Sequence, residues 1–488
     1  MDPFNPEVKK EDDIDESSPS TVNPDASLYS QCGILRSIKE ESEERENYQF
    51  MDEVKEEIDI KIEEEEVPSP DDSLMLCSQE RPSLKEDRGK KSFSMDSEEE
   101  ALSLLILLRC RRRHRRRALW MHPITASRLT HGQFYMIMSD LRADDDKFFD
   151  YFRMTQESFN ELLAIIGPHI CKDSTHLRKS IPAEERLAMT LRLLATGCSS
   201  SELHYTFRYG KSTAREIVQE VCKAIREYLH DLCFPELTKQ EWLKIEEGFR
   251  CEAHFPNCIG AIDGKHVRLI KPTGSGSNYF CYKKYFLMVL LAVCDANYRF
   301  TFIDVGSYGK ASDSSIYKNS NLYKKMQQNT LNIPSDKAVS TNGDPLPFVF
   351  VGDEAFGLST HMLRPYGGKN LQHKKKIFNY RLSRARRYIE SAFGILTNKW
   401  RIFHRPLDLH VENAENIIRA CCTLHNFVRE RDGVHFEDTL NVVGLTDGDG
   451  AIQAGCPRSA ITIREKFSNY FSSIGSVSWQ DRMIGNRV

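Results

Sequence analysis

Two short apolar runs, each ending in an acidic residue, constrain this chain most. One covers residues 258–262 and ends at Asp263, and the other covers 348–351 and leads to Asp353. Such a run, stopped by Asp-Gly or Gly-Asp, is typical of a buried strand with a carboxylate at its end. Glu390 lies in a basic stretch whose apolar spacing predicts a helix. Two strands and one helix of this kind can bring three carboxylates together, which is a common way to hold two Mg²⁺ ions for phosphodiester chemistry.

Charge is divided unevenly along the 488 residues. Residues 1–100 carry a net charge of -19, and the rest of the chain carries +15. An acidic tail on a basic body predicts binding to a polyanion, with ordinary surface charge as the alternative. The tail is rich in Glu, Asp, Ser and Pro, so we expect it to be disordered.

The sequence predicts five parts. They are a disordered acidic tail (1–100), a basic linker (101–144), an all-α helix-turn-helix region (145–250), an α/β nuclease domain (251–431) and a C-terminal tail with a short helix (432–488). The 14 cysteines form no CxxC pair, and the first residues do not resemble a signal peptide. We therefore expect a reducing intracellular compartment and no transmembrane segment.

Two patterns before the helical region point to nuclear function. Residues 109–117 form a dense arginine cluster that predicts a nuclear localisation signal or a phosphate-contacting arm, with a solvated helix face as the alternative. We expect the nucleus as the main compartment, with the cytoplasm as a second one. The acidic tail also repeats an aliphatic-Lys-x-Glu pattern that resembles SUMO attachment sites, although a Lys/Glu-rich tail produces it by chance. The four lysines are Lys9, Lys39, Lys55 and Lys61.

Helical spacing from 182 to 225 predicts helices separated by a short turn at Gly210. Ser212 is expected to cap the last of these helices. A helix, a short glycine turn and a capped helix form the layout of a helix-turn-helix. Lys211, Ser212 and Arg215 at the start of the last helix are therefore candidate DNA contacts, with plain three-helix packing as the alternative.

Further residues are candidates for the carboxylate site or for an alternative metal site. Asp313 follows a glycine-rich turn and either binds metal or caps a helix. Arg386 and Arg387 lie one turn before Glu390, where they either pair with it or bind DNA phosphates. A zinc site is a weak alternative because its candidate ligands are irregularly spaced. Those candidates are Cys251, His254, Cys258 and His266.

Several motifs together resemble the PIF/Harbinger transposases and their host-domesticated HARBI1-like nuclease relatives. The motifs cover residues 261–267, 306–313, 351–356, 363–366, 378–394 and 420–426. The resemblance spans about 118–480. It implies an RNase H-like fold and a DDE triad of Asp263, Asp353 and Glu390, with Asp313 as a further metal ligand. It also implies Mg²⁺ or Mn²⁺ as cofactor, DNA as substrate and a Myb/SANT-like DNA-binding partner protein.

Three functions remain open at this point. The favoured one is metal-dependent DNA hydrolysis, with strand transfer as an extension. A catalytically silent DNA-binding or chromatin factor would use the same basic surface, and the acids would then serve only as scaffold. An adaptor built on the acidic tail would not bind DNA. Metal-dependent cleavage separates the first function from the second, and DNA affinity separates the third from both.

Overall fold

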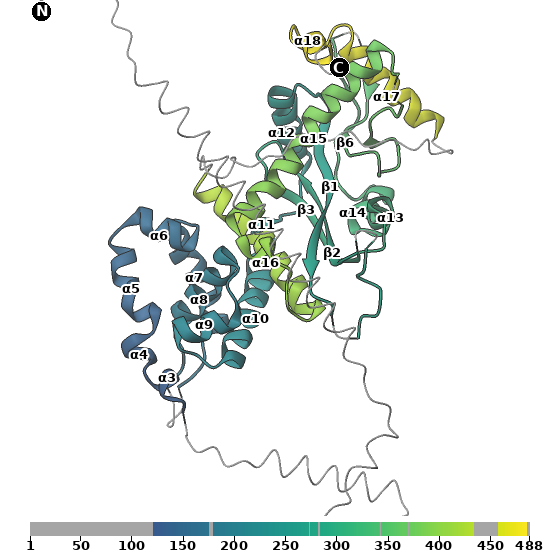
Figure 1. Cartoon of the computed structure of the whole chain (residues 1–488). Coiled ribbons are helices and arrows are strands. Elements are labelled where there is room, and N and C mark those ends of the chain that lie inside the picture. The colour runs from purple at the N-terminus through teal and green to yellow at the C-terminus, as the bar shows by residue number, and fades with distance from the viewer. Residues whose placement is uncertain are drawn as a thin grey trace, which may run out of the picture. The chain divides into compact units, whose positions relative to one another are not determined.

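The computed structural model describes residues 121–433, except 175–178, 273, 282–283, 342 and 369, and residues 457–485. The acidic tail, the arginine cluster at 109–117 and the four tail lysines lie outside the described residues. In the described part, α-helices precede a mixed β-sheet, and further helices follow and flank it (Figure 1). None of its helices is long and apolar enough to cross a membrane.

The N-terminal part of the described chain consists of helices. They are α3 (Pro123–Ala126), α4 (Arg128–His131), α5 (Gln133–Arg142), α6 (Asp145–Phe152), α7 (Gln156–Ile170), α8 (Ala183–Thr196), α9 (Ser200–Phe207), α10 (Lys211–Tyr228), α11 (His230–Cys233), α12 (Lys239–Gly248) and the π-helical turn η2 (Phe249–Ala253). Helix α8 ends at Gly197, whose φ of 68° suits glycine. Apolar residues of α10, such as Ile217 and Val221, are fully or almost fully buried, and the helix packs against α7, α8, α9 and α16 (Val411–Arg431).

The start of α10 differs from the sequence prediction. Its N-cap is Gly210, which has extended backbone and makes no side-chain cap bond. The prediction that Ser212 caps this helix is therefore wrong, because the helix begins at Lys211 and Ser212 already lies in its first turn. The hydroxyl of Ser212 is exposed to solvent rather than used to satisfy a helix N–H. The helix start thus remains accessible from outside.

The central sheet has five strands in the order β3-β2-β1-β6-β7. The strands are β1 (Cys258–Leu269), β2 (Phe286–Cys294), β3 (Phe300–Tyr308), β6 (Val349–Val351) and β7 (Met362–Leu363). Strands β1, β2 and β3 pair antiparallel, whereas β6 pairs parallel with both β1 and β7. A separate two-stranded sheet joins β4 (Lys337–Ala338) to β5 (Pro345–Leu346).

Alternating side chains of the sheet enter two different cores. Ala261 and Leu290 belong to a core shared with α15 (His373–Lys399) and α16. Ile262 and Leu291 belong to the other core, which they share with α13 (Asp313–Asn319) and α14 (Asn321–Gln327). This alternation follows from the two-residue period of a strand. Helices therefore cover both faces of the sheet, as an apolar strand such as β2 requires (Figure 1).

Residues 457–485 form α17 (Arg458–Phe471) and α18 (Gln480–Gly485) rather than one short helix, and both pack against α15. The buried guanidinium of Arg381 on α15 donates hydrogen bonds to the carbonyl of Gly475 and to Gln480 Oε1, at 3.1 and 3.0 Å. Phe471 from α17 packs against Phe255, which precedes β1. This C-terminal segment thus braces α15, the helix that carries Glu390. The 3-10 turn η3 (Arg401–His404) follows α15.

Candidate metal centre

Asp263 lies inside a strand, not at the end of one. The expectation that the strand stops at Asp263 is wrong, because β1 continues to Leu269 and stays paired with β2 throughout. Its parallel pairing with β6 does end earlier, at Ala261 opposite Val351. Asp263 therefore occupies the part of β1 that has lost its neighbour on one side, which leaves the side chain half-buried instead of enclosed.

The register between β1 and β6 brings Asp263 and Asp353 close together. Asp263 lies two residues beyond Ala261, and Asp353 lies two residues beyond its partner Val351. Side chains two residues apart on a strand point to the same face, and the extended β1 keeps this alternation through Asp263. The charge of Asp353 raises the pKa of Asp263, so the two acids are electrostatic neighbours.

Asp313 approaches β1 from α13 at Gly264, the residue next to Asp263, and its charge raises the pKa of Asp263. A Cβ atom built on Gly264 would lie 2.4 Å from Asp313 Oδ1 and 2.9 Å from its Cγ, so the carboxylate occupies the space that a side chain at 264 would fill. Ser312, and not Asp313, caps α13 by accepting a hydrogen bond from the Ser315 N–H. The cap is thus supplied by a neighbour, and the Asp313 carboxylate is directed to Gly264.

Glu390 is contributed by α15 and lies between basic residues. Its Oε1 is 3.4 Å from Arg386 Nη2, and the Glu390 side chain is 20% exposed. Arg387 is exposed to solvent. Burial raises the pKa of Glu390, whereas the charges of Arg386 and Arg387 lower it and the charge of Asp353 raises it. The charge of Asp353 therefore raises the pKa of each of the other three carboxyls.

The pKa values of Asp263, Asp313 and Glu390 lie above those of isolated carboxyls. Burial, followed by the charge of Asp353, raises the pKa of Asp263 to about 7, against the opposing charge of Arg386. Burial and the charge of Asp353 raise the pKa of Asp313 to about 6. Like charges in a partly desolvated site repel, and this repulsion favours the protonated forms. A cation among these oxygens would reverse the effect.

The chemistry of this donor set fits a hard divalent cation, which prefers carboxylate oxygens. The side chains are nevertheless turned to local partners. Asp263 Oδ1 accepts from the Gly264 N–H at 2.8 Å, and Asp353 Oδ1 accepts from the Ala355 N–H at 2.9 Å. Within the described residues, no three His, Cys, Asp or Glu side chains are arranged so that they could hold a metal ion. Ligation would therefore require these carboxylates to rotate toward one another.

Lys265 also lies at this site, and the sequence reasoning missed it. It follows Asp263 by two residues on β1, so both side chains are on one face of the strand. Its ammonium lies 5.7 Å from the ring centre of Phe393, one turn along α15 from Glu390. Burial lowers the pKa of Lys265, and the charge of Asp263 opposes that shift. Strand alternation was the signal that could have identified this residue.

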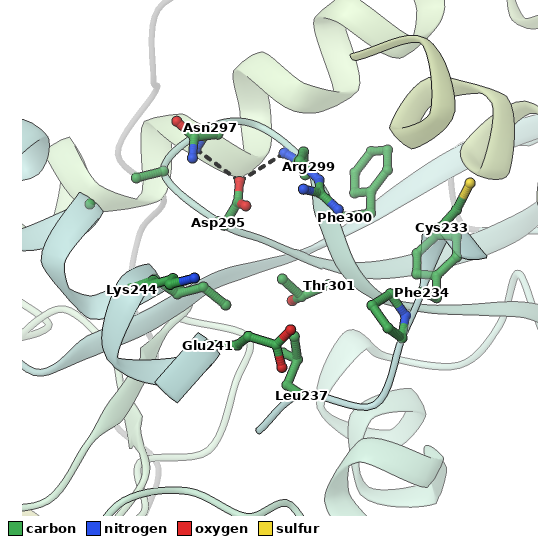
Figure 2. Close-up of a pocket in the computed structure, with 14 residues that line it drawn as sticks. Cys233, Phe234, Leu237, Glu241, Lys244, Asp295, Asn297, Arg299, Phe300 and Thr301 are labelled. Carbon is green, nitrogen blue, oxygen red and sulfur yellow. Dashed lines mark hydrogen bonds between the residues drawn. The ribbon is translucent and has the colours of Figure 1, made fainter. Parts of the chain in front are cut away.

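A well-formed cavity of about 280 Å³ lies elsewhere, beside the turn between β2 and β3 (Figure 2). Asp295 lines it and accepts hydrogen bonds from the N–H groups of Asn297 and Arg299, at 2.8 and 2.9 Å. These bonds hold the turn, which agrees with a structural role for Asp295. None of the four candidate metal ligands lines this cavity.

The remaining candidate residues fall into two groups. Lys211, Ser212 and Arg215 are all exposed at the start of α10, as a DNA-contacting surface requires. The zinc alternative is not supported in the described part of the chain, where no metal-binding group that includes cysteine or histidine is found. Cys258 is buried in β1 with a raised thiol pKa, and Cys251 is exposed.

The region that carries these residues is similar to known proteins. Residues 262–426, which contain all four acids, match the family described as DDE superfamily endonuclease. Protein ALP1-like from Arabidopsis thaliana is 28% identical over 311 residues, which cover 60% of this chain and 73% of that protein.

Two further relatives are more distant. The Arabidopsis protein named Antagonist of Like Heterochromatin Protein 1 is 26% identical over 58% of this chain and 73% of its own length. A rat protein named "Putative nuclease HARBI1" is 21% identical over 62% of this chain and 84% of its own length. No solved structure gives a significant match.

Proposed function

We propose that this chain, which contains a DDE superfamily endonuclease domain and is homologous to ALP1-like and HARBI1 proteins, is a transposase-derived nuclease that hydrolyses DNA phosphodiester bonds with Mg²⁺ or Mn²⁺. The observation that carries this proposal is the β1–β6 register, which sets Asp263 beside Asp353. We also interpret the domain as RNase H-like. Its mixed sheet, with helices on both faces and acids beside paired strands, supports that interpretation.

Each acid has a proposed role. Asp263, Asp353 and Glu390 form the catalytic triad and, together with Asp313, hold the cation. When bound, a divalent cation would supply charge neutralisation and make an attacking hydroxyl more acidic. Gly264 makes room for the Asp313 carboxylate, since any side chain there would displace it. The raised pKa of Asp263 fits an acid that is stabilised in its charged form only when a cation is present.

Basic residues around the acids would bind the DNA backbone. Arg387 is exposed beside Glu390, and Arg386 is within reach of both Glu390 and Asp263. Guanidinium groups donate two parallel hydrogen bonds to phosphate, which suits both residues for holding DNA at the site. Lys211, Ser212 and Arg215 would contact backbone phosphates from α10, as the first turn of the last helix in a helix-turn-helix. A Myb/SANT-like partner, nuclear location and SUMO attachment in the tail belong to the same proposal.

One alternative function has specific support. Glu390 is paired with Arg386, and the acids of the described chain are not gathered into a metal-binding group. One relative is named as an antagonist of a heterochromatin protein. A silent DNA-binding or chromatin-associated role would use the basic residues and leave the acids without a cation.

Plasmid nicking separates the two functions. The purified full-length chain should nick supercoiled DNA in Mg²⁺ or Mn²⁺ and not in EDTA, and Asp263→Ala should abolish nicking while DNA binding persists. Asp295→Ala is the control, because Asp295 is a buried aspartate beside the same sheet but lies at the turn between β2 and β3, away from the four acids. Binding without nicking in either metal would favour the silent role.

A further inference from the structure

The loop that joins β1 to β2 presents exposed rings beside the end of β3. Phe280 is 38% exposed and Tyr308 is 52% exposed. Tyr279 connects them, because it precedes Phe280 in the chain and its ring lies 5.2 Å from that of Tyr308. We call Phe280 and Tyr308 the aromatic tip.

The aromatic tip is fixed to the sheet instead of projecting freely. The Leu287 N–H donates to the Tyr279 carbonyl at 2.8 Å, and the Phe280 ring packs on Phe286 at 5.2 Å between ring centres. A Cβ atom on Gly309 would lie 2.6 Å from the same Tyr279 carbonyl oxygen, so the loop and the chain after β3 are in close contact. Rings held by such contacts lose little freedom when another planar group stacks on them.

The loop that carries Phe280 is basic. Between residues 268 and 286 the chain has four Lys or Arg residues and no Asp or Glu, although the charge of Glu415 on α16 also acts on Tyr279. Lys271, Lys284 and Lys310 are exposed, and Lys310 Nζ lies 2.7 Å from Ser277 Oγ. Exposed rings among cations are the combination that binds unpaired nucleotides, where bases stack and phosphates pair with the cations.

The aromatic tip is continuous with the candidate metal centre. Tyr308 ends β3, and its carbonyl accepts a hydrogen bond from the Ala311 N–H at 2.9 Å, two residues before Asp313. Asp313 in turn lies against Gly264. On the other side, β1 continues from Asp263 to Leu269, which pairs with Phe286, the residue on which Phe280 packs. At about 3.3 Å per residue the tip lies about 20 Å along the strand from Asp263, so a DNA strand bound at the acids would bring nucleotides a few positions away next to these rings.

We propose that the aromatic tip binds unpaired nucleobases of DNA a few nucleotides from the scissile phosphate, so that the protein prefers a locally opened duplex. The inference rests on the proposed nuclease function for its location, but the binding preference is measured without cleavage. Base stacking on Phe280 and Tyr308 supplies the preference, and the lysines hold the adjoining phosphates.

The test uses the full-length chain in EDTA, so that no cleavage occurs. Its probes are a fully paired duplex and the same duplex with a three-nucleotide mismatched bubble that carries 2-aminopurine. Wild-type protein should bind the bubble about tenfold more tightly, a factor within the range that base stacking provides. Binding should also quench the 2-aminopurine fluorescence, because the base stacks on a ring.

Variants assign the effect to the aromatic tip. Phe280→Ala/Tyr308→Ala should lose the bubble preference and the quenching, yet bind the paired duplex as wild type does. Tyr308→Phe keeps the ring and should retain both, and Tyr228→Ala removes an exposed ring on α10 as the matched control. Lys310→Ala should weaken binding to both DNAs, which provides a second variant if the double variant does not fold.

The outcomes distinguish this inference from the nuclease proposal. Equal wild-type affinity for bubble and duplex would overturn it even if the protein nicks DNA. Retained preference and quenching in the double variant would overturn it as well. A protein that prefers the bubble through these rings but never nicks DNA would uphold the aromatic tip and contradict only the nuclease proposal.

Discussion

Asp263 on β1 and Asp353, which follows β6, each lie two residues beyond Ala261 and Val351, the last residues that pair between these two parallel strands. The apolar runs that precede the two acids are buried, so the register is fixed by the core. A slip of one residue would turn Asp263 to the opposite face of the sheet. The position of Asp263 in the site thus depends on the pairing of β1 with β6, and burial of the apolar runs favours this pairing.

Gly264→Ala should weaken metal binding without a large loss of folding stability. The new methyl group would displace the Asp313 carboxylate from its place 2.4 Å from the ideal Cβ position. Because the displaced atoms end a flexible side chain, unfolding free energy should change by less than about 1 kcal/mol. Mn²⁺ affinity, measured by titration calorimetry, should nevertheless fall. Gly394→Ala on α15 is the control, since a Cβ there meets nothing within 4 Å. Equal affinity in the two variants would mean that Asp313 is not a ligand.

Buried His425 should make the fold sensitive to acid. Its Nε2–H donates to the Tyr298 carbonyl at 2.8 Å, and burial lowers its pKa to about 3. An unfolded histidine has a pKa of about 6.5. The unfolded chain therefore takes up a proton between these values that the folded chain does not. Stability from this group is complete above that window and falls by about 1.4 kcal/mol per pH unit as pH drops through it.

Urea unfolding of wild type and His425→Gln at several pH values measures this contribution. The difference in unfolding free energy between the two proteins should shrink as the pH falls from 7 toward 4, since only the wild type loses the histidine contribution. Other titrating groups are common to both proteins and cancel. A difference that stays constant over this window would show that His425 does not couple folding to protons.

Apolar runs that end in an acidic residue predicted the elements that carry the candidate acids. The apolar runs before Asp263 and Asp353 do form buried strands, and Glu390 does lie on a long helix. The continuation of β1 past Asp263 was not predictable from the apolar run, because Gly264, Lys265 and His266 read as a turn. Pairing with β2 overrides that local preference.

Contacts between segments far apart in the chain also could not be predicted from the sequence. Asp313 lies against Gly264 although 49 residues separate them, and only the packing of α13 on the sheet creates this contact. The same holds for Arg381, whose buried partners come from the C-terminal segment. Local patterns predict elements, whereas the sheet order and helix packing decide which side chains meet.

The start of α10 should contribute phosphate contacts. Lys211→Ala and Arg215→Ala should each weaken DNA binding and make the slope of log affinity against log salt shallower by about one, because each lost contact releases about one counterion fewer. Lys223→Ala on the same helix is the control, as its side chain is 63% exposed and pairs with Glu227. Fluorescence anisotropy at several salt concentrations measures the slopes. Unchanged slopes for both variants would remove α10 from the DNA interface.

The N-terminal charge asymmetry should affect location and DNA affinity. A fluorescent fusion with residues 111–113 and 115–117 changed to alanine should move from the nucleus to the cytoplasm. Removing residues 1–100, which carry -19, should tighten DNA binding at low salt and lose that effect as salt screens the charge. Persistent nuclear signal would instead assign import to a partner protein, and equal affinity of both chains at low salt would exclude masking by the tail.

Mn²⁺ binding tests most directly whether the four acids form one cation site. Asp353 is the acid whose charge acts on Asp263, Asp313 and Glu390 alike, so its loss should disturb the site most. Calorimetry should show at least about tenfold weaker Mn²⁺ binding for Asp353→Asn than for wild type. Asp344→Asn, which changes an aspartate that is 75% exposed and paired with Lys466, should bind as wild type does. Equal Mn²⁺ affinity for wild type and Asp353→Asn would contradict the account.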